Sequence, residues 1–375
     1  MEWGMRWFVG MAEPPAGLDP PHCPRSDCRY HRSAEGWRWV RHGWFSRRAD
    51  PRRIRRFRCR HCGHTFSEQT FSPTYWLKRP DLLLSIAHRL LACSGFRQIA
   101  REARCAPTTV MRQSARLGRH ALLALHHRRP RGPVAEPVVI DGFESFEYSQ
   151  YHPLHLNLAV GAETHYCYGF TESELRRKGR MRAAQRRRRA WLEARFGRPD
   201  PRAIETGMTT LLKMVAPAPQ SLVVRSDEHD DYPRALRRLA GHRVTHQPTS
   251  SREARTAGNP LFPVNRLDLL LRHNGANHKR ETIAFSKRRQ SVLERAALLI
   301  LWQNFSKRFS ERHGGPTPAM RLGLATRPIP LQELFAERLF PARVGLPEEW
   351  LRYYRREVVT RRVPNGRRHT LTLAF

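Results

Sequence analysis

Two pairs of cysteines near the N-terminus constrain the fold of this chain more than any other feature. Cys23 and Cys28 form the first pair, and Cys59 and Cys62 form the second. Four thiolates at this spacing are the ligand set of a structural zinc site. Between the pairs, Trp, Val and Phe alternate with Arg, which predicts a short antiparallel ribbon. We therefore expect residues 21–70 to form a zinc ribbon that holds structural Zn²⁺; four unconnected free thiols are the alternative.

Three histidines lie beside these cysteines and could each replace one thiolate: His22, His61 and His64. Because four thiolates already complete a tetrahedral site, we expect the cysteines to be the ligands. The chain has seven Cys, an odd number, and close pairs suit metal binding in a reducing cytoplasm better than a disulfide framework. The N-terminus lacks an apolar run followed by a cleavage site, so no secretory signal is expected.

The charge of the chain indicates its partner. Lys and Arg total 68 against 33 Asp and Glu, which gives a formal net charge of +35. Such a field attracts polyanions, and the absence of a long apolar run argues against a membrane anchor as its reason. Trp, Phe and Leu are spread along all 375 residues as in a globular protein, unlike small ribosomal or chromatin proteins. We expect two or three domains that bind nucleic acid.

Residues 80–125 carry helical periodicity and contain a pattern typical of a helix-turn-helix. Ile99 and Ala100 would pack inside the first helix, and Pro107 would start the second, where its missing amide does no harm. The second helix would present five side chains to a DNA groove: Thr108, Thr109, Arg112, Gln113 and Arg116. The alternative is an ordinary helical hairpin. Residues 126–136 are rich in Pro and Arg without periodicity and are expected to be a linker.

After this linker the pattern predicts an α/β domain in which two strands run into single aspartates. The run 138–140 leads to Asp141 and the run 221–224 approaches Asp227, with further strands expected at 154–160 and 164–170. If these strands are neighbours in one sheet, the two carboxylates converge. Such oxygen ligands suit a pair of Mg²⁺ ions, which can activate a hydroxyl and stabilise the leaving oxygen of a phosphodiester.

Each aspartate also has a simpler interpretation. Asp141 is followed by Gly142, a pair typical of a hairpin turn, and an aspartate after a strand is often a helix cap. Capping is less favoured for Asp227, because Asp230 and Asp231 are better placed to cap the helix that follows. We therefore favour a metal-binding role for both residues.

Two basic segments complete the chain. Residues 172–200 are expected to be a helical insertion between the third and fourth strands, with a run that could bind phosphates: Arg186, Arg187, Arg188 and Arg189. A solvated charged face is the alternative for each of these arginines. Residues 326–375 are expected to be a basic tail that packs on the core or on a partner subunit, and residues 1–20 an N-terminal tail.

Taken together, these features resemble the DDE transposases of bacterial insertion sequences, in the branch with a zinc ribbon and a helix-turn-helix ahead of a ribonuclease-H-like catalytic domain. The resemblance covers about residues 20–325. It rests on the paired cysteines, on Asp141 and its strand, on Asp227 with Tyr232 downstream, and on the blocks 280–287 and 317–324. It implies an α/β catalytic domain over residues 137–325, a mixed sheet with flanking helices, with Asp141 and Asp227 as the first two acids.

The third acid is expected on a helix that starts near Pro263. Relatives tend to carry Glu at the position that matches Asn265, and a neutral amide is a poor metal ligand. Asp268 lies one turn along the same helix and could take the role. Glu281 and Glu294 are the other candidates, although pairing with neighbouring arginines is a simpler explanation for Glu281. A site that has lost its activity is the remaining alternative.

The resemblance implies a transposase. It would bind the ends of its element and the target DNA, hold two catalytic Mg²⁺ ions, hydrolyse the phosphodiester at each end and transfer the freed strand. Joining two ends implies a homodimer or a higher oligomer, and the expected location is the bacterial cytoplasm, at the nucleoid. Two other functions stay open: a non-catalytic DNA-binding regulator derived from a transposase, and a metal-dependent DNA nuclease.

Overall fold

The N-terminal part of the protein is a small antiparallel sheet. The computed structural model describes residues 19–47, 50–70, 72–250, 252–279 and 281–363, so most of the expected N-terminal tail and the last residues of the C-terminal tail lie outside the described residues. A short 3-10 helix, η1 (Arg29–His31), precedes three strands, β1 (Trp39–Arg47), β2 (Asp50–Cys59) and β3 (Thr65–Ser67). They pair in the order β1-β2-β3, which agrees with the expected ribbon. We call residues 19–70 the cysteine module.

Three helices follow the cysteine module: α1 (Leu82–Leu91), α2 (Phe96–Glu102) and α3 (Pro107–His127). Ile99 and Ala100 of α2 are buried, and Pro107 is the first residue of α3, as the sequence predicted. α3 is 21 residues long and is buried along its second half, because α8 and the C-terminal helices cover it. The second helix of the helix-turn-helix pattern, α3, therefore extends into the hydrophobic core of the molecule.

A mixed sheet of five strands forms the other half of the protein. Its strands are β4 (Val138–Phe146), β5 (Pro153–Gly161), β6 (Cys167–Glu174), β7 (Ser221–Ser226) and β8 (Arg243–Pro248). The order is β6-β5-β4-β7-β8, in which β4, β5 and β6 are antiparallel and β7 and β8 run parallel to β4. The sequence predicted four of these strands and missed β8. The fold is therefore of the mixed α/β class, as expected.

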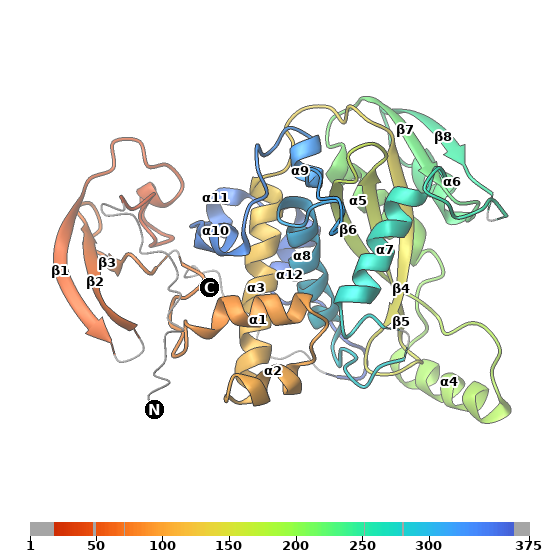
Figure 1. Ribbon diagram of the computed structural model, residues 1–375, viewed down its shortest axis with the longest axis horizontal. Helices are drawn as coiled ribbons and strands as arrows, with labels where there is room; N and C mark the ends of the chain where they lie inside the picture. The colour runs from red at the N-terminus through yellow and green to blue at the C-terminus, as the bar shows by residue number, and fades with distance from the viewer. Residues whose placement is uncertain (1–18, 48–49, 71, 251, 280, 364–375) are drawn as a thin grey trace.

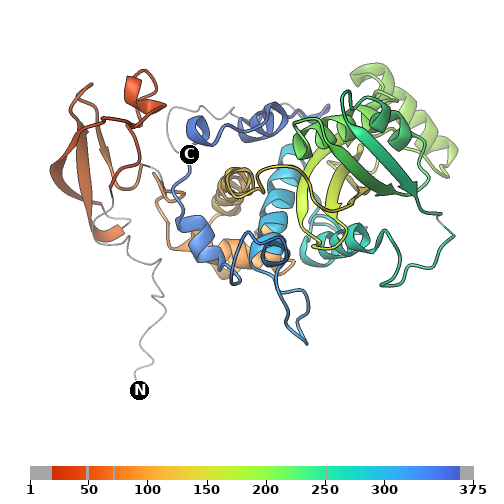
Figure 2. The same ribbon diagram turned by 90° about the horizontal axis from the view of Figure 1, so that it is seen from above.

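Helices cover both faces of this sheet. One face carries α5 (Ala203–Val215) and α6 (Asp231–Arg237), and the other carries α7 (Phe262–Asn274) and α8 (Arg289–Phe305). Figure 2 shows α5 (green) and α7 (teal) on opposite sides of the strands. Helix α4 (Ala183–Phe196), the expected basic insertion, projects from the body and buries only Leu192 (Figure 1). None of the described helices is both long and apolar enough to cross a membrane.

The C-terminal segment completes the core. Its helices are α9 (Pro318–Arg321), α10 (Leu331–Ala336), α11 (Pro341–Val344) and α12 (Glu348–Tyr354). Trp350, Tyr353 and Tyr354 are buried in the same hydrophobic cluster as α1, α3, α8 and one face of the sheet. Residues 326–363 are therefore an integral part of the body, and packing on the core is one of the two arrangements expected for the C-terminal segment. The same cluster joins α1–α3 to the sheet, so the expected linker at 126–136 does not divide two cores.

Candidate metal centres

The four paired cysteines come together as the sequence predicted. Their sulfur atoms all lie within 4.8 Å of one another, and the Sγ atoms of Cys23 and Cys62 are 3.6 Å apart. Gly63, at φ +69°, turns the chain so that the Cys59 amide donates to the His64 carbonyl. This group could hold a metal ion such as zinc, since four thiolates match its preferred tetrahedral ligand set. The three neighbouring histidines are not part of it.

The environment of the thiols differs from one to the next. Burial acts against ionisation of Cys59, but the indole Nε1 of Trp37 donates to its sulfur at 3.2 Å and, together with backbone amides, lowers its pKa to about 7. Burial raises the pKa of Cys23 above its ordinary value. A cation bound among the four sulfurs would favour the ionised form of each thiol. The donor set therefore fits a structural metal.

The register of the sheet brings Asp141 and Asp227 together. In the parallel pair β4–β7, Val139 lies opposite Arg225. Asp141 is two residues further along β4, and Asp227 is two residues beyond Arg225, directly after the end of β7. Burial raises the pKa of Asp141 to about 6, with a further contribution from the negative charge of Asp227. The two carboxylates are thus close enough to repel each other. Asp141 lies inside β4, paired with Leu158, which excludes the hairpin turn.

Local hydrogen bonds fix both side chains. The Gly142 amide donates to Asp141 Oδ1 at 2.6 Å, and the Tyr232 hydroxyl donates to the same atom at 3.2 Å. The His229 amide donates to Asp227 Oδ1 at 3.0 Å, while α6 begins only at Asp231, so Asp227 does not cap this helix. Burial and the charges of nearby aspartates raise the pKa of Tyr232 above its ordinary value.

Helix α7 places Asp268 near Asp141. Val264, Leu267 and Leu271 anchor one side of α7 in the core, and α7 contacts β4 and β5. Burial and the negative charge of Asp141 raise the pKa of Asp268 to about 8. Its Oδ1 atom is buried and has no hydrogen-bond partner among the described residues. We call Asp141, Asp227 and Asp268 the aspartate cluster; its carboxylates do not form a group as compact as the four thiols.

The two other candidates for the third acid lie in different environments. Glu281 is exposed on the loop between α7 and α8. Glu294 is buried in α8, where its Oε1 atom is 3.0 Å from Arg356 Nε. The largest charge effects on Asp268 come from Asp141, Arg272 and Arg255, and neither glutamate is among them. The structure therefore brings Asp268, and neither glutamate, close to Asp141.

The residues expected to contact DNA from α3 divide into two groups. Thr108 and Arg112 are exposed and Thr109 is partly exposed. Gln113 is buried and donates to the Arg79 carbonyl at 3.0 Å, and Arg116 donates to the carbonyls of Pro73 and Tyr75 at 2.8 and 2.7 Å. These two side chains hold the segment before α1 and do not face an open groove, contrary to the expectation.

The arginine run lies on α4. Arg186, Arg187 and Arg188 are exposed. Arg189 is partly buried and donates to the Arg177 carbonyl at 2.9 Å, and its Nε atom lies 3.5 Å from Glu193 Oε1. Three of the four arginines are therefore accessible to a polyanion, and the fourth helps to hold the helix.

Sequence reasoning did not identify two residues at the aspartate cluster. Arg255, an exposed residue before α7, is close enough to lower the pKa of both Asp141 and Asp268. His155 occupies the space above Gly142, where a Cβ atom would lie 1.5 Å from its Nε2. No short-range signal marks either residue, since both reach the site through the tertiary fold.

Comparison with known proteins adds no identification. No protein-family model matches the chain, and no curated protein matches it. What this protein does therefore has to be inferred from its own residues and their geometry.

Proposed function

We propose that this protein is a DDE-type transposase that binds DNA and catalyses metal-dependent phosphodiester hydrolysis and strand transfer. One observation carries the proposal: Asp141 and Asp227, far apart in the chain, meet at adjacent strands, and Asp268 approaches Asp141 from α7. Carboxylates that repel one another in a partly buried site are typical of functional centres. The mixed sheet with helices on both faces is also what the resemblance to these transposases predicts.

The aspartate cluster fits a hard divalent cation. The buried Oδ1 of Asp268 has no hydrogen-bond partner among the described residues, and burial disfavours the charged form of Asp141, so a bound cation would stabilise both carboxylates. Asp141, Asp227 and Asp268 would hold Mg²⁺, which in such sites activates the attacking oxygen and stabilises the leaving oxygen. Tyr232 and the Gly142 amide orient the Asp141 carboxylate through their hydrogen bonds. Arg255 supplies a positive charge beside the cluster, suited to a phosphate.

The rest of the molecule offers positive charge to DNA. The net charge is +35, and Arg112 on α3 and Arg186 to Arg188 on α4 are exposed. Each phosphate neutralised by such a side chain steepens the salt dependence of binding by about one unit. The proposal includes assembly into a homodimer or higher oligomer, because strand transfer joins two ends, and action at the nucleoid of a bacterial cytoplasm.

The experiment uses labelled DNA that flanks the gene on both sides, purified full-length protein and Mg²⁺. Asp141→Asn and Asp227→Asn should each abolish nicking and joining while DNA binding persists. Asp230→Asn is the matched control. Asp230 is an exposed aspartate three positions after Asp227, and its side chain does not cap α6. DNA binding without nicking by the wild type would support the regulator, and nicking without joining would support the nuclease.

A further inference from the structure

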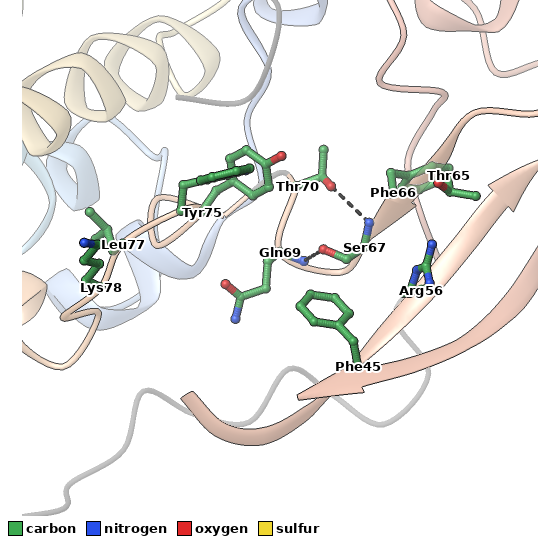
Figure 3. Close-up of a pocket in the computed structure, with 11 residues that line it drawn as sticks. Phe45, Arg56, Thr65, Phe66, Ser67, Gln69, Thr70, Tyr75, Leu77 and Lys78 are labelled. Carbon is green, nitrogen blue, oxygen red and sulfur yellow. Dashed lines mark hydrogen bonds between the residues drawn. The ribbon is translucent and has the colours of Figure 1, made fainter. Parts of the chain in front are cut away.

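A cavity outside both metal centres lies between the cysteine module and the segment that leads to α1. Its volume is about 740 Å³, and its walls come from β1, β2, β3 and residues 69–70 and 75–78. Figure 3 shows Phe45 and Arg56 on one side of this space, with Tyr75 and Lys78 across it. Sites for small ligands usually have ~300–1,000 Å³ and apolar walls with a few polar groups. The cavity is therefore large enough for a ligand such as a nucleobase.

Aromatic side chains are available to a ligand at this cavity. Trp76 lines it and is 75% exposed, and Phe45 on β1 is 38% exposed. Trp76 also has φ +59°, a backbone conformation that bulky residues rarely adopt. Strain of this kind persists only where surrounding contacts impose it, often at functional positions.

Those surrounding contacts come from α3. Arg116 donates to two carbonyls within the turn, those of Pro73 and Tyr75, and Gln113 donates to the Arg79 carbonyl that follows it. The turn that carries Trp76 is thus fixed on a long buried helix. A pre-organised aromatic side chain loses little conformational entropy when it binds a ligand.

Cations surround the aromatic residues. Arg56 and Lys78 line the cavity. Close by on strands β1 and β2, the Arg55 guanidinium lies 3.4 Å from the ring centre of Trp44. Aromatic rings alternating with cations are typical of surfaces that bind single-stranded nucleic acid, in which bases stack on the rings and phosphates meet the charges. A stacked duplex does not offer its base faces in this way.

We propose that this cavity receives an unstacked base of single-stranded or locally melted DNA, which stacks on Trp76 and Phe45 while Arg56 and Lys78 meet the adjoining phosphates. The inference rests on the proposed function for the choice of DNA as the ligand. It gives the cysteine module and the 72–78 segment a preference for unpaired strands.

The test measures the binding of fluorescein-labelled oligodeoxythymidylate, and of a duplex of the same length, to the full chain without divalent ions. Trp76→Ala and Phe45→Ala should each weaken binding of the single strand about ten-fold or more, as loss of one stacked base predicts, with duplex binding changed less than about two-fold. Trp76→Phe should restore most of the affinity. Trp191→Ala is the control, since Trp191 is also exposed and lies beside an arginine, but on α4; it should change both affinities by the same factor.

Several results would overturn the inference. These are a wild type that does not bind the single strand, a Trp76→Ala variant that binds both DNA forms as the wild type does, and equal losses for both forms. A change in the sedimentation coefficient of Trp76→Ala would indicate that a second copy of the chain fills the cavity instead. The binding test needs no cleavage, so a failed binding test does not alter the result with flanking DNA. Loss of cleavage of flanking DNA likewise does not alter the result of the binding test.

Discussion

At the scale of single residues, the identity of the third acid can be tested most directly. Asp268 faces Asp141 and has an unpartnered buried oxygen, whereas Glu281 is exposed on a loop. Asp268→Asn should lower the single-turnover cleavage rate roughly a thousand-fold or more, because a lost metal ligand removes several kcal/mol of transition-state stabilisation. Glu281→Gln is the control and should leave the rate within about two-fold. The reverse ranking would assign the third acid to Glu281.

A buried histidine predicts how stability depends on pH. His120 on α3 is completely buried 2.9 Å from the Leu334 carbonyl, and burial lowers its pKa to about 4. Since the value in the unfolded chain is near 6.5, His120 contributes stability that is fully present above pH ~6.5 and is lost as pH falls toward 4. This one group should lower the free energy of unfolding by up to ~3 kcal/mol over that range.

Urea unfolding at pH 7, 5.5 and 4.5 measures this effect. His120→Gln cannot titrate and can still donate to the carbonyl, so its loss of stability on acidification should be smaller than that of the wild type by about this amount. His127→Gln, at an exposed position of the same helix, should follow the wild type. Parallel curves for His120→Gln and the wild type would show that His120 does not titrate with unfolding.

Residue types at fixed spacing were the most informative part of the sequence. The Cys pairs and the two strand-linked aspartates could be predicted because each depends on local pattern. The inward orientation of Gln113 and Arg116 could not be predicted, since their partners are backbone carbonyls more than thirty positions away. Arg255 was missed for the same reason.

At the scale of helices and strands, apolar runs were sufficient for the strands that are buried. Strand β8 was not predicted from the sequence, because its residues are exposed or only partly buried and it therefore has no apolar run. Strand β6 extends to Glu174 beyond the expected end, because Arg289 of α8 forms ion pairs with Glu172 and Glu174 there, at 3.2 and 3.4 Å. The sequence of a strand does not show such a distant cation.

The contact between α3 and α8 leads to a prediction about Gly118. A Cβ atom at this position would lie 2.4 Å from the Glu294 carbonyl oxygen of α8. Gly118→Ala should therefore force the two helices apart and lower the free energy of unfolding by ~2 kcal/mol or more, measured by urea denaturation. Gly258→Ala is the control, because its nearest neighbour is 3.8 Å away. Equal stability of both variants would mean that the helices separate without cost.

Metal removal tests the cysteine module as a unit. If four thiolates hold zinc, the bound ion contributes ~10–16 kcal/mol of apparent binding energy to a small module. A strong chelator should then unfold residues 19–70, seen as a change in tryptophan fluorescence, while the helical circular dichroism of the body persists. Cys59→Ser should behave like the chelated protein, and Cys105→Ser, outside the thiol group, like the wild type. Cooperative loss of both signals would instead show that the module and the body unfold together.

At the scale of the whole molecule, one core joins parts that the sequence suggested were separate. The expected boundary at 126–136 followed composition, which reports chain flexibility and not packing. The C-terminal segment, expected as a tail, contributes Trp350, Tyr353 and Tyr354 to the core around α3 and α8. Linear patterns predict which residues are buried, but they do not predict which distant segment covers them.

The same C-terminal segment docks the cysteine module. In both views, α10 and α11 lie between the three-stranded sheet and the body (Figures 1 and 2). Phe340, 2% exposed, packs in a cluster with Phe57 and Phe66, and its ring centre is 5.2 Å from that of His22 and 5.0 Å from that of His31. An aromatic anchor of this size fixes a small module on a large one.

Phe340→Ala should therefore release the module without unfolding the body. Truncating a buried Phe costs ~3–5 kcal/mol, and here the loss falls on the docking contact. The radius of gyration from small-angle scattering should rise, limited proteolysis within residues 72–81 should accelerate, and the melting temperature of the body should change little. Leu339→Ala is the matched control: Leu339 is buried in the core of the body, so its truncation should lower that melting temperature and leave the module docked. If Phe340→Ala keeps the wild-type dimensions and proteolysis rate, other contacts, such as Arg343 to the Arg32 carbonyl at 3.2 Å, hold the module in place.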